Sequence, residues 1–252
     1  MSQTVTRDFS HLGTGELMMR RRGSGAPFIP VGNASEVKFA VSTDEKTQRD
    51  YRTPGGGTRN RIERINSVTL ECQVFDLSPR NLAIVVYGEQ SEIAEGTASE
   101  VITAYAGGYN PLKRPGAHSV AVYEDDGNGE KGTAVDESYY ELDKGCLVLT
   151  EAGADLDGQT LHIEYEHGEI QVIEALRNTG YEYEATFRGT NEANGAPFAV
   201  DIHRQRFAPT DELSLIGDDF SQLQMKASVL SDAGRGAGES AFFRLQMGNA
   251  QQ

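Results

Sequence analysis

Apolar and polar residues alternate with a period of two along most of this chain, which predicts β-strands. In residues 36–41, for example, Val37, Phe39 and Val41 alternate with Glu, Lys and Ala. Similar alternation recurs at residues 68–74, 119–123, 161–165, 181–187, 198–202, 223–229 and 243–247. Successive side chains of a strand point to opposite faces, so these segments are expected to be half-buried. About ten strands beside a single helix make the chain mainly β, a β-sandwich or barrel.

One short helix is indicated at residues 78–88. Ser78 is a favourable N-cap residue, because its hydroxyl can accept a hydrogen bond from the first turn. Pro79 suits the first helical position, and Gly88 suits the residue that follows the last turn. An apolar stripe at spacings of three and four begins at Leu82, so we expect the helix to flank a sheet.

Three segments depart from the alternation and define the expected domains. Residues 1–30 show no core pattern and contain three consecutive arginines, glycines and prolines, which predicts an extended N-terminal arm. Residues 42–61 are charged and contain three consecutive glycines, which predicts a long loop suited to partner contact. Residues 92–168 form an inserted acidic β-module. The β-core is then expected to comprise residues 31–91 and 169–252.

The expected module consists of short strands separated by strong turn signals. Residues 124–129 read Glu-Asp-Asp-Gly-Asn-Gly, a cluster typical of a turn. Residues 139–142 and 146–150 flank Asp-Lys-Gly, which predicts a hairpin. Such short strands and frequent turns are compatible with a small β-unit inserted into a larger one.

The formal net charge of −15 is distributed unevenly. Residues 1–70 carry +4, from 11 Lys/Arg against 7 Asp/Glu, whereas residues 92–168 carry −12, from 4 against 16. An acidic surface repels phosphates, which disfavours a protein that grips nucleic acid. The simplest interpretation of the charge is solubility, because net charge governs solubility and association and not the fold.

The cellular location follows from what the sequence lacks. No apolar run approaches the ~20 residues that span a bilayer, and residues 1–19 lack the pattern of a secretion signal. We therefore expect synthesis and folding in the cytoplasm, without membrane contact. Cys72 and Cys146 stand alone, so two free thiols are expected in that reducing compartment.

Signatures of catalysis are absent from the sequence, so neither an enzyme nor a bound cofactor or metal is expected. Asp126 and Asn128 alternate as calcium ligands do, but Lys131 stands where a calcium loop needs glycine, so a hairpin turn is expected there. Glu182 and Glu184 share one face of a strand and cannot flank a sugar as a glycosidase pair does.

Three motifs together resemble the tail tube (major tail) protein family of long-tailed, non-contractile bacteriophages. They are residues 31–39 (VGNASEVKF), 75–83 (FDLSPRNLA) and 207–220 (FAPTDELSLIGDDF). Residues 139–143 (YYELD) and 157–159 (DGQ) resemble the β-insertion of some members. Each motif is modest alone, but their order and spacing cover nearly the whole chain.

The resemblance implies a structural virion protein. In that family six β-sandwich subunits with a flanking helix form a ring, and the rings stack into a tube through which DNA passes. The implied partners are copies of the same chain, the tape measure protein, and the tail terminator and distal tail proteins. Viral DNA would pass in transit without specific binding, and the mature location would be the virion tail.

The resemblance also suggests roles for particular residues. Carboxylates on polar strand faces would line the channel and repel phosphates. The candidates for this lumen-facing role are Glu71, Glu182, Glu184 and Asp201. The arm and the long loop would make the contacts between rings. The candidates there are Arg20, Arg21, Arg22, Arg49, Tyr51, Arg52, Arg59 and Arg61.

Other function classes stay open on the sequence alone. A monomeric β-sandwich binding module, such as an adhesin or a carbohydrate-binding domain, would need an aromatic platform beside a groove. A ring protein like that of type VI secretion would share the fold but lack the insertion. A hydrolase without a recognisable motif is the third alternative.

Overall fold

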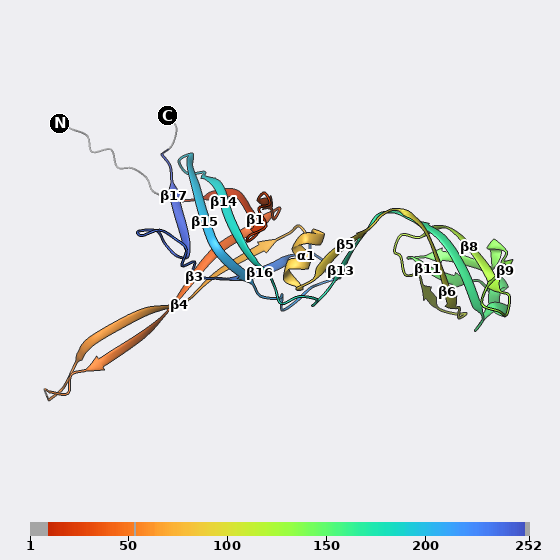
Figure 1. The fold of residues 1–252 in the computed structure, drawn as a ribbon, viewed down its shortest axis with the longest axis horizontal. Coiled ribbons are helices and arrows are strands. Elements are labelled where there is room, and N and C mark those ends of the chain that lie inside the picture. The colour runs from red at the N-terminus through yellow and green to blue at the C-terminus, as the bar shows by residue number, and fades with distance from the viewer. Residues whose placement is uncertain (1–9, 53, 250–252) are drawn as a thin grey trace. The chain divides into compact units, whose positions relative to one another are not determined.

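The computed structural model describes residues 10–52 and 54–249, and the chain divides into two compact units (Figure 1). Unit 1 comprises Met1–Glu89 and Ile173–Gln252, and unit 2 comprises Gln90–Val172. Both units consist mainly of β-strands with few helical residues. The module expected at residues 92–168 falls within unit 2, and the expected core residues provide most of unit 1.

The described residues of unit 1 form one antiparallel sheet and one α-helix. Its elements are β1 (Gly13–Arg21), β2 (Ile29–Pro30), β3 (Ala34–Arg49), β4 (Thr58–Val74), α1 (Pro79–Val85), β14 (Glu182–Asn191), β15 (Ala196–Phe207), β16 (Leu223–Val229) and β17 (Phe243–Met247). The hydrogen-bonded order is β2-β1-β14-β15-β16-β4-β3, and β17 pairs with the first half of β15. Strands from the N-terminal and the C-terminal segments of unit 1 therefore lie side by side, as β1 and β14 do.

Strand β1 overturns the expectation that residues 1–30 form an extended arm. All 9 residues of β1 pair with β14. Leu17 and Met19 are buried in the core of unit 1. Met18, which points to the opposite face, is also apolar, so the sequence around it does not alternate cleanly. Residues 1–9 lie outside the described residues.

The core of unit 1 lies on one face of the sheet. It includes alternate residues of β4 and β16, as the period of two predicts, together with Ile84 and Val85 of α1. The two ends of the sheet approach each other, because Leu17 of β1 and Phe39 of β3 line one open cleft of ≈ 740 Å³. The strand order gives β1 and β3 no mutual pairing among the described residues. The sheet therefore curls without closing into a barrel.

The loop expected at residues 42–61 is instead most of a long β-hairpin. Strand β3 extends to Arg49 and β4 begins at Thr58, so the connecting turn is short. The two strands pair from Ala34 opposite Val74 to Arg49 opposite Thr58. A hairpin exposed on both faces has no need of apolar alternation, and its sequence therefore resembles that of a loop.

Helix α1 begins as the sequence predicts and ends differently. The Ser78 hydroxyl accepts a hydrogen bond from the Asn81 backbone N–H at 3.2 Å, and proline occupies the first turn. The left-handed position after the helix belongs to Tyr87, with φ of 51°, and not to Gly88. Gly88 instead allows the backbone to pack closely against Ile173, since a Cβ at this position would lie 2.7 Å from Ile173 Cγ2.

Unit 2 is built from two small sheets that share one apolar core. Its strands are β6 (Gly96–Thr103), β7 (Tyr109–Pro111), β8 (His118–Asp125), β9 (Lys131–Ala134), β10 (Tyr140–Asp143), β11 (Cys146–Leu149) and β12 (Thr160–His167). Short 3-10 helices span Glu137–Tyr139 and Glu151–Leu156. The predicted hairpin is present as β10 paired with β11, and Leu161, Ile163 and Tyr165 of β12 are buried as expected.

The chain passes between the units through β5 (Glu89–Ile93) and β13 (Ile170–Glu174), which pair with each other. Cys72 is buried in unit 1 and Cys146 is half-buried in unit 2, and both thiols are free. Burial raises the pKa of the Cys72 thiol to about 12. In the part of the chain that the structure describes, no helix has the length and hydropathy to cross a bilayer.

Candidate assembly surfaces

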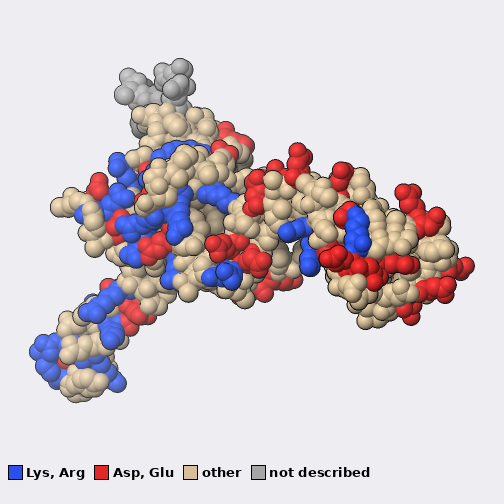
Figure 2. Space-filling model, turned by 45° about the vertical axis from the view of Figure 1, so that its right-hand side comes forward, with Lys and Arg blue, Asp and Glu red and all other residues tan. Residues whose placement is uncertain are grey.

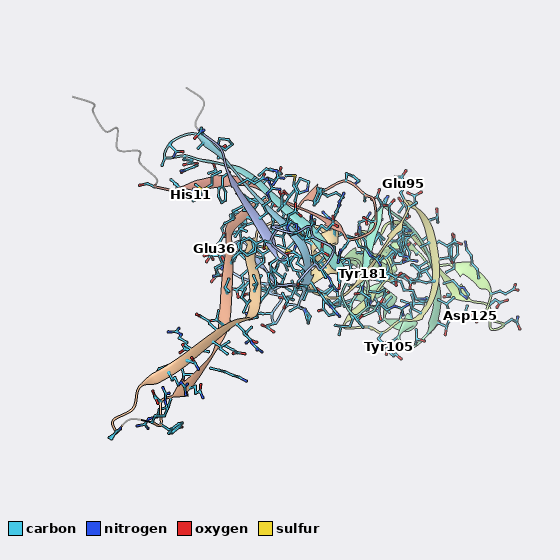
Figure 3. The ribbon with its side chains drawn as sticks, turned by 60° about the vertical axis from the view of Figure 1, so that its left-hand side comes forward. His11, Glu36, Glu95, Tyr105, Asp125 and Tyr181 are labelled. Atoms are coloured by element: carbon cyan, nitrogen blue, oxygen red, sulfur yellow. The ribbon has the colours of Figure 1, made fainter. Side chains whose placement is uncertain are left out.

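The distal part of the β3–β4 hairpin has no packing partner among the described residues. Every residue from Val41 to Arg49 and from Gly57 to Ser67 is exposed. Figure 3 shows side chains projecting from both faces of this ribbon, beyond the labelled Glu36. The exposed length of β3 is about 26 Å at the usual rise of a strand. An isolated two-stranded ribbon is only marginally stable in water, so a partner would stabilise it.

The tip of this hairpin, residues 46–62, is basic although the protein is acidic. It carries five Lys/Arg against one Asp/Glu, a net charge of +4. Figure 2 shows the Lys and Arg side chains gathered over this tip. Four of the candidate ring-contact arginines lie in this tip. They are Arg49, Arg52, Arg59 and Arg61.

Only part of this positive charge is neutralised within the chain. Arg61 pairs with Glu45 at 2.9 Å, and Arg52 pairs with Asp50 at 3.3 Å. The ion pairs of the described residues include neither Arg49 nor Arg59. Tyr51, the remaining candidate on the tip, is 85% exposed. Unpaired cations beside an exposed aromatic ring provide a surface that an acidic and partly apolar partner can bind.

The other three ring-contact candidates are engaged inside unit 1. Arg20 pairs with Glu184 at 2.6 Å. The guanidinium of Arg21 lies 3.4 Å from the centre of the Tyr181 ring. Arg22 pairs with Asp232 at 3.0 Å. These arginines belong to β1 or follow it directly, so they are part of the sheet of unit 1 and not of a separate extended arm.

The sheet of unit 1 has open edges. Strand β2 covers only two residues of β1, and the Val31 N–H donates to the Leu17 carbonyl at 2.9 Å, which leaves Gly13–Glu16 paired on one side alone. Strand β3 ends the strand order, and β17 pairs with β15 only, among the described residues. Open edges present rows of unsatisfied N–H and C=O groups that can accept a further strand.

All four lumen candidates lie on the polar face of the sheet, opposite the core. Their strand neighbours are core residues, such as Leu70 and Cys72 beside Glu71, and Tyr183 between Glu182 and Glu184. Each carboxylate has a cationic partner on a neighbouring strand or turn. The closest pairs are Glu71–Lys226 at 3.1 Å, Glu182–Arg204 at 2.6 Å, Glu184–Arg20 at 2.6 Å and Asp201–Arg188 at 2.6 Å.

The pKa is lowered at three of these carboxylates, Glu71, Glu182 and Asp201. The hydrogen bonds from Lys226 lower the pKa of Glu71, and those from Arg204 lower the pKa of Glu182. Partial burial alone would raise the pKa of Asp201, but hydrogen bonds from Thr186 and Arg188 outweigh it and the pKa is lowered. At these four positions each carboxylate is therefore paired with a cation. The role of these carboxylates in lining a channel stays a prediction.

The described residues show no cluster of three or more His, Cys, Asp or Glu side chains able to hold a metal ion. Asp126 accepts hydrogen bonds from the backbone N–H of Asn128 at 2.8 Å and of Glu130 at 3.1 Å. That carboxylate thus stabilises the turn between β8 and β9, which is the hairpin turn expected from the sequence. Glu182 and Glu184 each form an ion pair with an arginine of a neighbouring strand.

Comparison with known proteins adds a family but no activity. Residues 10–246 match the model of a family described as "Protein of unknown function UCP028589". The chain belongs to this family. No curated protein matches it significantly. Among solved structures, the pilus backbone RrgB of Streptococcus pneumoniae aligns at 10% identity over 93% of this chain and 92% of that chain. Its TM-score of 0.13 is too low to indicate a shared fold.

Sequence analysis missed one exposed surface, the segment of residues 211–220 between β15 and β16. It is irregular, and Leu215, Ile216 and Phe220 are 85%, 94% and 92% exposed. The signal was present in the sequence, since Leu-Ser-Leu-Ile lacks strand alternation and lies between pairs of acidic residues. The resemblance used these residues only as part of the motif at 207–220 and assigned them no role.

Proposed function

We propose that this chain is a structural subunit that assembles with copies of itself into stacked hexameric rings, forming the tail tube of a long-tailed bacteriophage. The observation that carries the proposal is the β3–β4 hairpin, whose distal residues are exposed on both faces. A ribbon of this kind gains stability when a second molecule covers it, and a tube supplies that molecule at every ring.

The open sheet supports the same proposal. Strands β1, β3 and β17 leave backbone groups without partners among the described residues. In a monomer such edges promote aggregation, whereas in a closed ring each edge pairs with the next subunit. A head-to-tail contact that closes gives a ring, and stacking the rings gives a filament. The mainly β fold and the family motifs of the sequence agree with this architecture.

The polar face of the sheet suits a channel through which DNA slides. Lys226, Arg204, Arg20 and Arg188 each bind a carboxylate of the same face. Cations engaged in this way are less available to phosphates, and the chain as a whole carries −15. In the proposed tube the channel would therefore bind DNA weakly, even though each of these carboxylates is paired with a cation. Unit 2, which is acidic, would decorate the outside.

Negative-stain electron microscopy of the purified chain tests the proposal. We expect rings with a central channel, or tubes, at high protein concentration. The control is a variant in which residues 43–64 are replaced by a short Asn-Gly turn, which leaves the core strands intact and should stay monomeric. A wild-type chain that remains a small, uniform particle would favour a monomeric binding module instead.

A further inference from the structure

The irregular segment 211–220, here called the acidic loop, combines exposed apolar residues with negative charge. It contains four carboxylates, Asp211, Glu212, Asp218 and Asp219, and no Lys or Arg. Three large apolar side chains within it are at least 85% exposed. They present on the order of 400 Å² of apolar surface, an area typical of interaction sites.

The acidic loop and the hairpin tip are complementary in both charge and polarity. The loop carries −4, and residues 46–62 of the tip carry +4. Tyr51 and Ile62 of the tip are 85% and 55% exposed, and could cover the apolar residues of the loop. In the described residues no hydrogen bond or ion pair joins the two segments, so each is free to bind elsewhere.

We propose that the acidic loop of one copy of this chain binds the hairpin tip of a second copy. The inference rests on the proposed function and names the surface that receives the hairpin. Each copy offers one tip and one loop, so the contact is heterologous and can repeat from copy to copy. Charge attraction would guide the two segments together, and burial of Leu215, Ile216 and Phe220 would stabilise the contact.

The acidic loop suits the tip better than unit 2 does, although unit 2 is also acidic. Residues 90–172 contain 17 Asp/Glu against 4 Lys/Arg, but those charges are spread over a whole domain. Unit 2 attracts the tip without offering comparable apolar side chains in a single segment. The loop joins four charges and three highly exposed apolar residues within ten positions, which provides both steering and burial.

Disulfide cross-linking between two differently tagged variants tests the contact. Both carry Cys146→Ser, and Cys72 is buried and unreactive. One variant adds Tyr51→Cys on the tip, and the other adds Ile216→Cys on the loop. The matched control replaces the second variant by Tyr105→Cys, a 60% exposed residue of unit 2. We expect the 51–216 adduct to form about tenfold faster than the 51–105 adduct, and to slow markedly in high salt.

Charge reversal provides a second readout that does not depend on cysteines. Asp218→Lys with Asp219→Lys, or Arg49→Glu with Arg59→Glu, should each abolish assembly in light scattering. The four changes combined in one chain should restore it. All four side chains are exposed, so far-UV circular dichroism and urea stability should stay unchanged.

The outcomes separate this inference from the proposed function. Tubes in the wild type, together with a 51–216 adduct no faster than the 51–105 adduct, would overturn the loop contact and leave the tube standing. Efficient 51–216 cross-linking in open chains that lack a channel would keep the contact and refute the tail tube. Faster formation of the 51–105 adduct would assign the tip to unit 2 and overturn the inference.

Discussion

The burial of β1 makes a quantitative prediction for Met19→Ala. Met19 is 0% exposed, and its sulfur lies 3.6 Å from the side-chain nitrogen of the buried Gln205. The substitution removes three heavy atoms, which costs about 2.4 kcal/mol at ~0.8 kcal/mol for each buried group. The remaining cavity raises the expected loss to about 3–4 kcal/mol. Met18→Ala, on the half-buried opposite face, is the matched control and should cost less than about 1 kcal/mol.

Urea unfolding of the full chain, followed by circular dichroism, measures this loss. A domain of this size loses about 2–3 kcal/mol of stability per molar urea, so the Met19→Ala midpoint should fall by about 1–2 M. Unit 2 has its own core, and the transition that reports on it should not move. If Met19→Ala shifts the midpoint no more than Met18→Ala does, β1 is not a core strand, and residues 13–21 would belong to the arm expected from the sequence.

Three further predictions concern unit 1. Gly189→Ala should destabilise the chain by about 1–3 kcal/mol in urea unfolding, because a Cβ there would lie 2.1 Å from Thr14 O. Gly195→Ala is the control: its Cβ would meet nothing within 4 Å, but φ is 71°, so its loss of stability measures backbone strain without a clash. Titration with a thiol reagent at pH 8 should find one reactive cysteine in the folded chain and two after denaturation, because Cys72 is buried and its thiol has a pKa of about 12. If both cysteines of the folded chain react rapidly, the burial of Cys72 is contradicted. The lowered pKa of Glu182 means that the folded state binds fewer protons there than the unfolded state, so its pairing with Arg204 stabilises above the ordinary pKa of 4.5 and is lost as the pH falls below that value. Glu182→Gln should flatten the decline of stability from about pH 5 to about pH 3 relative to wild type, and an unchanged slope would contradict the pairing.

Strands with one buried face could be predicted from the sequence. In β16 every second residue from Leu223 to Val229 is buried, which is the alternation that the sequence displays. The β3–β4 hairpin could not be predicted as strands, because exposure of both faces removes the apolar signal. Strand β1 was hidden by Met18, an apolar residue on the polar face.

The ion pairs of the polar face were also beyond prediction from sequence. Arg20 and Glu184 are 164 positions apart and meet only because β1 pairs with β14. The sequence identified the carboxylates on polar strand faces, but it gave no information about the register that brings each one to a cation. The tip arginines lie in an exposed hairpin and not in the expected loop, and their role in ring contacts stays a prediction.

Hydrogen–deuterium exchange tests most directly whether copies of the chain complete its open sheet. The wild type at assembling concentration is compared with the variant that lacks residues 43–64. In the wild type we expect slow exchange at alternate backbone N–H groups along the outer edges of β3 and β17, and fast exchange at β17 in the variant. Equally fast exchange at these edges in both samples would contradict the account.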